Sequence, residues 1–155
     1  MENKKVCSFY VSEYHLLTIL LPYINEKIIE NKNVEIFAEE DMIDIVKRYL
    51  RKNEIFENIK IIKLGWKKSK KENVIIKEKY DIAIVIGKEK YIEEINYILN
   101  ENRIEEIVNC FNIENLNNLK EIVMQHDFVL KTQGKSEVLK SSHNEQKRKT
   151  IQTQI

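Results

Sequence analysis

The feature that most constrains the fold of this sequence is a regular alternation of strand-like and helix-like apolar patterns. Short runs rich in β-branched and aromatic residues predict strands, and apolar residues at helical spacing lie between most of them. The predicted strands cover residues 6–11, 34–38, 59–64, 81–87, 107–111 and 128–131. Alternation of this kind places helices on both faces of a parallel sheet. The sequence therefore predicts a Rossmann-like α/β fold, a three-layer α/β/α arrangement with a mostly parallel sheet of about six strands.

The order of these strands follows a weaker signal. The uninterrupted apolar run at residues 81–87 is the strongest strand pattern and is typical of a central strand that is covered on both faces. The natural arrangement is then a six-stranded doubly wound sheet with the first and fourth strands at its centre. Residues 65–79, which include Trp66 and several lysines, have no regular pattern and are expected to form a connector.

The predicted helices cover residues 13–30, 39–50, 91–99 and 116–123. Ser12 is placed to cap the first of them, because its hydroxyl can accept a hydrogen bond from a free backbone N–H. Pro22 lies inside this helix and is expected to kink it or split it near Thr18. The acidic residues 39–41 favour the start of the second helix, where negative charge meets the positive end of the helix dipole.

Length and composition indicate one α/β domain over residues 1–134. From residue 135 the chain loses its apolar periodicity, so residues 135–155 are expected to form a disordered basic and polar tail. The 26 basic and 25 acidic residues nearly cancel, which gives no general attraction to nucleic acid or to a membrane. Without a secretory leader or a long apolar segment, the sequence predicts a cytoplasmic protein with Cys7 and Cys110 as reduced, buried thiols.

Ligands of open doubly wound sheets bind beyond the carboxyl ends of the strands. Residues 10–15, 39–41 and 87–90, together with Asn112 and Thr132, are expected at that edge. Within this set we predict a ligand-binding group made of Tyr10, Ser12, His15, Glu39, Asp41, Gly87 and Lys88.

The scarcity of glycine argues against the common cofactors of this fold. The turn after the first strand, Val11 to Tyr14, contains no glycine, whereas a dinucleotide fingerprint and a P-loop both need glycines that let the backbone approach phosphate. No cofactor is therefore predicted. The Cys and His residues show no CxxC or HxxxH spacing, so no metal site is predicted. Nothing in the sequence marks either thiol as an activated nucleophile, so no catalytic residue is predicted.

Two stretches are similar to a known sensory family. Residues 9–41 and 107–134 resemble the start and the end of the MEDS domain, a sensory module named from methanogens and methylotrophs. The first stretch contains the step Leu21-Pro22-Tyr23 within its helix, and the second contains Cys110 and Phe111 in a strand before a helix that closes on His126. The chain departs from the family before the second strand, where it has Lys32-Asn33 in place of a glycine–glutamate pair.

This resemblance implies a descendant of RecA- or KaiC-type ATPases that has lost its phosphate loop. Members of the family are thought to sense small molecules and are often joined to DNA-binding or kinase modules. The resemblance therefore implies a stand-alone sensor that acts through a partner. It supplies no ligand residues to transfer to this chain.

Three functional hypotheses remain. The first is a non-catalytic sensory or regulatory domain that binds a small-molecule ligand or a regulatory protein partner. The second is a small α/β enzyme, a transferase or hydrolase, with His15 or Asp41 as a general base at the carboxyl edge. The third is a nucleic-acid or protein interaction module that uses Trp66, the lysine-rich segment 67–71 and the tail.

Overall fold

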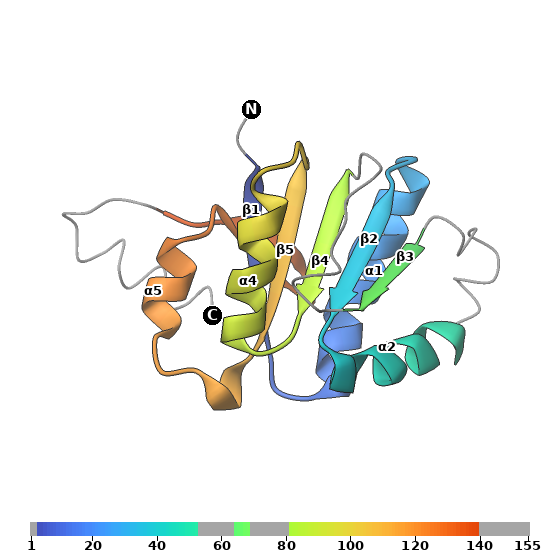
Figure 1. Cartoon of the computed structure of the whole chain (residues 1–155), viewed down its shortest axis with the longest axis horizontal. Helices are drawn as coiled ribbons and strands as arrows, with labels where there is room; N and C mark the ends of the chain where they lie inside the picture. Colours follow the sequence, from blue (N-terminus) through green and yellow to red (C-terminus); the bar gives the residue numbers. More distant parts are fainter. Residues whose placement is uncertain (1–2, 53–63, 69–80, 140–155) are drawn as a thin grey trace.

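The computed structural model describes residues 3–52, 64–68 and 81–139, and these residues form a three-layer α/β/α fold (Figure 1). Their sheet has seven strands in the order β3-β2-β4-β5-β1-β6-β7, and every pair of neighbours is parallel except β6 and β7. The strands are β1 (Lys4–Tyr10), β2 (Val34–Ala38), β3 (Leu64–Lys68), β4 (Ile82–Ile86), β5 (Glu106–Asn112), β6 (Phe128–Lys131) and β7 (Gly134–Glu137). The predicted fold class, a Rossmann-like α/β arrangement with a mostly parallel sheet, is confirmed.

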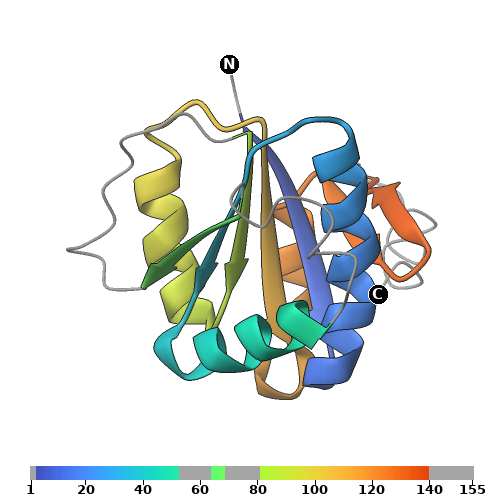
Figure 2. The ribbon, with the colours of Figure 1, turned by 90° about the vertical axis from the view of Figure 1, so that its right-hand side faces the viewer.

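Helices cover both faces of this sheet (Figure 2). One hydrophobic cluster joins the sheet to α1 (Glu13–Ile29) and α2 (Glu40–Lys52). A second cluster joins the opposite face to α4 (Glu89–Leu99) and α5 (Leu119–Met124), with the short 3-10 helix η3 (Ile113–Asn115) between β5 and α5. The sheet is therefore buried between two helical layers over most of its width.

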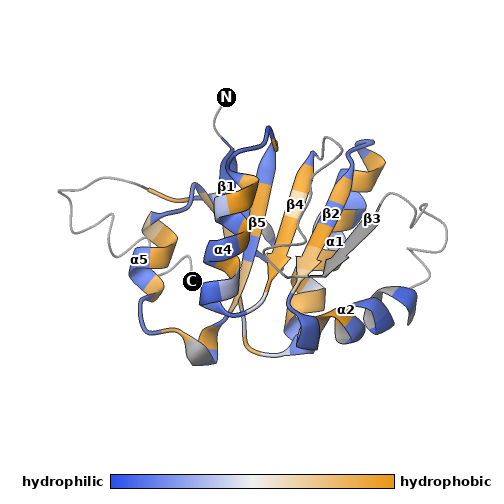
Figure 3. Cartoon of the chain, in the orientation of Figure 1, coloured by the Kyte–Doolittle hydropathy of each residue, from blue (hydrophilic) through white to orange (hydrophobic). Residues whose placement is uncertain are grey.

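The strand β4 shows how the sequence produces this arrangement. All five of its residues are buried, and successive side chains point to opposite faces. Ile82, Ile84 and Ile86 pack with α1 and α2, whereas Ala83 and Val85 pack with α4. Figure 3 shows the hydrophobic character of β4 along its length. Full burial of one large aliphatic side chain contributes about 1.5–3 kcal/mol, so a strand buried on both faces stabilises both clusters.

The expected strand order is wrong. β1 does not lie beside β4, because β5 lies between them and pairs with β1 from Lys4↔Glu106 to Tyr10↔Asn112. β4 pairs with β2 on its other side. Both β1 and β4 are interior strands, as their apolar patterns indicated, but a burial pattern does not say which strand lies next to which.

The third strand also differs from the prediction. Residues 59–63 of the expected strand lie outside the described residues, and β3 begins at Leu64 and ends at Lys68. Residues 65–68 were expected in a connector and instead pair in parallel with β2. The rest of the expected connector, residues 69–79, lies outside the described residues, so the proposed Trp66 and lysine surface falls partly in a strand and partly beyond the description.

The expected domain boundary at residue 134 is too early. β7 pairs antiparallel with β6, from Phe128↔Glu137 to Lys131↔Gly134, and Val138 is buried in the cluster formed with α4 and α5. All four residues of β7 are exposed, so its sequence carries no apolar strand pattern. Charged and polar side chains are typical of a strand at a sheet edge. Residues 140–155 lie outside the described residues.

The helix α1 runs through Pro22 without the expected split near Thr18. Proline removes one backbone hydrogen bond, but seven buried apolar residues hold this helix against the sheet. Those residues are Leu16, Leu17, Ile19, Leu20, Tyr23, Ile24 and Ile28. Among the described residues, none of the helices combines the length and the apolar character needed to cross a membrane.

Candidate functional site

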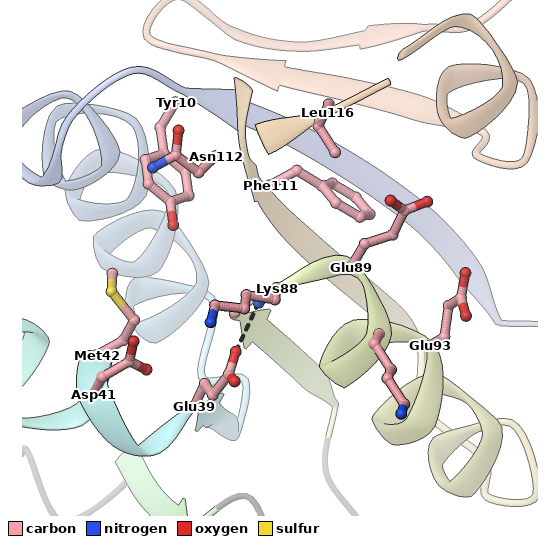
Figure 4. Close-up of a pocket in the computed structure, with 12 residues that line it drawn as sticks. Tyr10, Glu39, Asp41, Met42, Lys88, Glu89, Glu93, Phe111, Asn112 and Leu116 are labelled. Atoms are coloured by element: carbon pink, nitrogen blue, oxygen red, sulfur yellow. Dashed lines mark hydrogen bonds between the residues drawn. The ribbon is translucent and has the colours of Figure 1, made fainter. Parts of the chain in front are cut away.

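A pocket of about 580 Å³ opens at the carboxyl edge of the sheet, where β1, β2, β4 and β5 end (Figure 4). The chain leaves β1 and β2 toward the face covered by α1 and α2, and it leaves β4 and β5 toward the opposite face. Diverging connections of this kind open a crevice in α/β sheets. We call this space the edge pocket, and its lining residues are Tyr10, Glu39, Asp41, Met42, Gly87, Lys88, Glu89, Lys90, Glu93, Phe111, Asn112 and Leu116.

Glu39 joins the ends of β2 and β4 at the floor of this pocket. Its backbone N–H donates to the Ile86 carbonyl at 2.9 Å, and its side-chain Oε1 accepts the backbone N–H of Lys88 at 2.7 Å. Lys88 is the N-cap residue of α4, and its own side chain makes no capping hydrogen bond. The Glu39 carboxylate therefore takes the place that an anion would take at the start of α4.

Gly87 makes this junction possible. A Cβ atom on Gly87 would lie 2.4 Å from Cδ2 of Tyr91, 2.8 Å from Oε1 of Glu39 and 3.0 Å from Cβ of Glu39. A side chain at this position would displace the buried Tyr91 ring and the Glu39 carboxylate together. The glycine after β4 thus serves a close packing contact between two loops.

Tyr10 is the last residue of β1, and only 4% of its surface is exposed. Its hydroxyl points into the edge pocket in Figure 4 and makes no hydrogen bond to another described residue. Burial is the main cause that raises the pKa of this hydroxyl above its ordinary value, followed by the electrostatic influence of Cys110, Asp41, Glu13 and Glu39. The hydroxyl is therefore neutral and lies in a region of negative potential.

Ser12 and His15 have roles within the turn between β1 and α1. Ser12 is the N-cap of α1, as predicted, and its hydroxyl accepts the backbone N–H of His15 at 3.1 Å. The His15 ring accepts the backbone N–H of Val11 through Nδ1 at 3.0 Å. A neighbouring hollow of about 410 Å³ shares Tyr10, Met42 and Asn112 with the edge pocket and is also lined by Ser12, Glu13 and Tyr14.

The structure brings together five of the seven predicted ligand-binding residues, namely Tyr10, Glu39, Asp41, Gly87 and Lys88, around the edge pocket. Ser12 lies in the neighbouring hollow, and His15 lines neither space. Thr132, which was also expected at this edge, lies in the β6–β7 turn and lines a separate hollow beside α1.

Sequence reasoning missed four lining residues. Helical spacing could have found two of them, because Met42 follows Glu39 by three positions and Glu93 follows Glu89 by four positions on one helix face. Phe111 was predicted as the last residue of a strand, and it lies in the pocket one residue before the end of β5. Leu116 was predicted to begin a helix over residues 116–123, but α5 begins at Leu119, and Leu116 lies in the connection after η3.

A buried polar network lies behind the pocket, between β5 and the helices α4 and α5. Asn96 and Asn109 exchange side-chain hydrogen bonds of 2.7 and 3.2 Å, and the Asn109 amide also contacts Nε2 of His126 at 3.0 Å. His126 Nδ1 lies 2.5 Å from the Ile122 carbonyl, which fixes it as the donor and leaves Nε2 as the acceptor. His126 therefore serves a satisfied network within the core.

The cysteines also belong to the core. Cys7 and Cys110 are free and fully buried, and burial, followed by the influence of Cys7, raises the pKa of the Cys110 thiol. Within residues 3–52, 64–68 and 81–139, no group of three or more His, Cys, Asp or Glu side chains is arranged to hold a metal ion.

The lining of the edge pocket combines apolar and charged groups. Its described residues provide apolar walls, one neutral hydroxyl, one amide, four carboxylates and two lysines, with no Ser, Thr, Cys or His among them. A Ser–His or Cys–His pair is therefore not assembled by these residues.

No protein-family model matches the chain, and no curated protein shows significant similarity to it.

Proposed function

We propose that this protein is a non-catalytic sensory or regulatory module that binds a small molecule in the edge pocket, as its MEDS-like sequence features suggest. The observation that carries the proposal is the Tyr10 side chain, which is 4% exposed, directs its hydroxyl into the pocket and makes no hydrogen bond to a described residue. Because the hydroxyl opens on the pocket, a ligand that enters the pocket can exchange a hydrogen bond with it. The pocket volume of about 580 Å³ lies within the usual range for small-molecule sites.

The loss of a phosphate-binding turn supports a function other than nucleotide hydrolysis. The backbone N–H groups of Val11 and His15 donate to side chains of the same turn, so they are occupied within the protein. Glu13 adds a negative charge in the first turn of α1, where a bound phosphate would need positive potential. The start of α4 is likewise occupied by the Glu39 carboxylate.

The setting we propose is the cytoplasm, with a separate regulatory protein as the receiver of the signal. Two free buried thiols suit a reducing compartment. Ligand binding at the junction of β2 and β4 would bear on α2 and α4, which begin at that junction on opposite faces of the sheet. Movement of α2 and α4 would transmit ligand binding from the pocket to the outer surface of the protein.

The proposal is tested by screening metabolites against the ¹⁵N-labelled protein by two-dimensional NMR. We expect a subset to shift the backbone signals of Tyr10, Gly87 and Asn112 and to raise the melting temperature. Met42→Trp fills the space that the edge pocket shares with the neighbouring hollow and should abolish the shifts. Ile29→Trp is the matched control, because Ile29 is 71% exposed at the end of α1 and lines none of the described pockets.

Two results would contradict the proposal. The first is a set of ligands that bind with equal affinity to the Met42→Trp protein, which would place their site elsewhere. The second is stabilisation by ATP with measurable turnover by the purified chain, which would indicate an enzyme.

A further inference from the structure

The charged side chains of the edge pocket differ in how far they are exposed to solvent. Four carboxylates and two lysines line it. The charged side chains that are half-buried are Glu39 and Glu89, whereas Asp41, Glu93, Lys88 and Lys90 are exposed. An exposed lysine can turn its ammonium group into water, but a half-buried carboxylate stays in place. The deeper charges of the pocket are therefore negative, and the exposed charges are of both signs.

These carboxylates have few direct polar partners. None of the four forms an ion pair with a residue that the structure describes. Glu39 accepts one hydrogen bond through Oε1, from the Lys88 backbone, and Oε2 has no partner among the described residues. Contact with two loops and with Gly87 fixes the position of this carboxylate, so it is pre-organised to meet a positive charge.

Tyr10 provides an observation that is independent of the acidic cluster. The Tyr10 residue is 4% exposed, and its hydroxyl points into the same space and has no hydrogen-bond partner among the described residues. The electrostatic influence of Asp41 and Glu39 acts on this hydroxyl and, after burial and Cys110, raises its pKa. A neutral phenol in a negative field offers its oxygen lone pairs to a donor such as an ammonium N–H.

The remaining walls are apolar. Phe111, Leu116 and Met42 face the pocket, and Phe111 is held by stacking on Phe9 with ring centroids 5.8 Å apart. A rigid aromatic ring beside carboxylates is the usual composition of a site for an organic ammonium group, because the ring face attracts cations and packs against carbon atoms. A hard metal ion would need a group of several ligand side chains, and the described residues contain no such group.

We propose that the ligand is a small organic cation, whose ammonium group lies between the Tyr10 hydroxyl and the Glu39 carboxylate and whose carbon skeleton packs against Phe111 and Leu116. This inference rests on the proposed function, because it names the class of molecule that the edge pocket binds. It excludes nucleotides and other phosphate esters from the same pocket, because their negative charge meets Glu39 and Glu89.

The test uses the full chain and three sets of probes that share size and carbon skeleton and differ in one group. The smallest trio is 2-phenylethylamine, 2-phenylethanol and phenylacetate, and larger primary, secondary and quaternary amines are paired with their alcohol and carboxylate analogues. Binding is followed by NMR shifts of Tyr10, Phe111 and Asn112 and by calorimetry. We expect the amines to bind at least tenfold more tightly than their analogues, with an affinity that falls as salt concentration rises.

Variants assign the binding to the proposed groups. Glu39→Gln keeps an oxygen acceptor for the Lys88 N–H and removes the charge, and Tyr10→Phe keeps the ring and removes the hydroxyl. We expect Glu39→Gln to weaken amine binding by roughly tenfold or more and Tyr10→Phe to weaken it by a smaller factor. Glu94→Gln is the matched control, because Glu94 is also half-buried on α4 and does not line the edge pocket, and it should leave amine affinity unchanged.

The outcomes separate this inference from the proposed function. Alcohols or carboxylates that bind in the edge pocket as tightly as the amines would overturn the inference and leave the binding function standing. Amines that bind with unchanged affinity to both Glu39→Gln and Tyr10→Phe would also overturn it. If none of the three sets shifts the pocket signals, the inference fails, whereas the proposed function fails only if the metabolite screen also finds no ligand for the edge pocket.

Discussion

Lys135 links β7 to the interior of the domain, and its replacement by methionine tests whether this strand belongs to the fold. Its Nζ lies 2.6 Å from Oε1 of Glu106, whose side chain is 4% exposed. The other carboxylate oxygen of Glu106 accepts the hydroxyl of Tyr23 from α1. Lys135 Nζ also lies 4.6 Å from the ring centroid of Phe128. Lys135→Met keeps an alkyl chain of similar length and removes the charge from all these contacts.

The size of the effect follows from the burial of the two partners. Removing one member of a fully buried ion pair costs about 3–5 kcal/mol, because the other charge is left without compensation. The Lys135 side chain is 30% exposed, so water can approach the Glu106 carboxylate and recover part of this cost. The Tyr23 hydrogen bond also remains. We therefore expect Lys135→Met to lower the free energy of unfolding by about 2 kcal/mol, which corresponds to a decrease of roughly 4–8 °C in melting temperature.

The assay is urea unfolding followed by circular dichroism, with Lys120→Met as the control. Lys120 is exposed on α5 and forms no ion pair with a described residue, so its replacement should change stability by less than about 0.5 kcal/mol. A double-mutant cycle with Glu106→Gln should give a coupling energy of about 1–2 kcal/mol. If Lys135→Met is as mild as Lys120→Met, Lys135 belongs to a flexible tail, as its sequence suggests, and the assignment of β7 to the sheet is wrong.

Three further predictions follow from the core and the pocket floor. Gly87→Ala should destabilise the protein by about 1–3 kcal/mol in urea unfolding, because the added Cβ would lie 2.4 Å from Tyr91; a neutral effect would show that the loops are loosely packed. Asn109→Leu should lower the free energy of unfolding by about 2–4 kcal/mol, because it leaves the buried side chains of Asn96 and His126 without their hydrogen-bond partner. The isosteric Asn109→Asp should not restore this stability, since a carboxylate at this position gains no new hydrogen-bond donor. Cys7 and Cys110 should resist a water-soluble thiol reagent until the protein unfolds, and rapid labelling of the native protein would refute this burial. The free energy of unfolding should also fall above about pH 8.5, because the folded state raises the pKa of the Cys110 thiol and the unfolded thiol ionises first.

The fold class was predictable because buried positions recur at regular spacings in the sequence, which gives a periodic pattern of apolar residues. The helix α1 and the strand β4 each bury nearly everything that their apolar patterns indicated. In the same way, the N-cap of α1 at Ser12 follows from local chemistry and was predicted correctly. Such features depend on near neighbours in the chain or on simple burial, and both can be recognised in a single sequence.

The strand order and the last strand could not be predicted for a physical reason. Neighbouring strands are chosen by packing between distant segments, and β1 would be equally apolar beside β4 or beside β5. β7 consists of exposed residues and is held by backbone pairing with β6 and by contacts that include those of Lys135 with Glu106 and Phe128. Backbone pairing is independent of side-chain type, so it leaves no pattern to find.

The candidate site was partly predictable because the carboxyl ends of parallel strands meet at one edge. Glu39 and Gly87 end two strands that turned out to be neighbours, so the topology brought them together even though the predicted order was different. The contact between them could not be predicted, since the approach of the Glu39 carboxylate to the Lys88 N–H depends on the packing of two loops from distant segments. The place of Leu116 in the pocket was also missed, because its apolar spacing predicted a helix that in the structure begins only at Leu119.

The site differs in polarity from the phosphate-binding sites of similar sheets, and this difference links its sequence to its proposed ligand. Where a sheet of this kind binds phosphate, free backbone N–H groups and the positive ends of helices face the ligand. Here Ser12, His15 and Glu39 occupy such N–H groups from within the protein. The Glu39 carboxylate accepts the Lys88 N–H at the start of α4 and also places a negative charge beside the pocket, where the Tyr10 hydroxyl offers its oxygen lone pairs. We therefore infer that Glu39, which occupies the start of α4 and lines the edge pocket, is the group that makes this edge complementary to a cation.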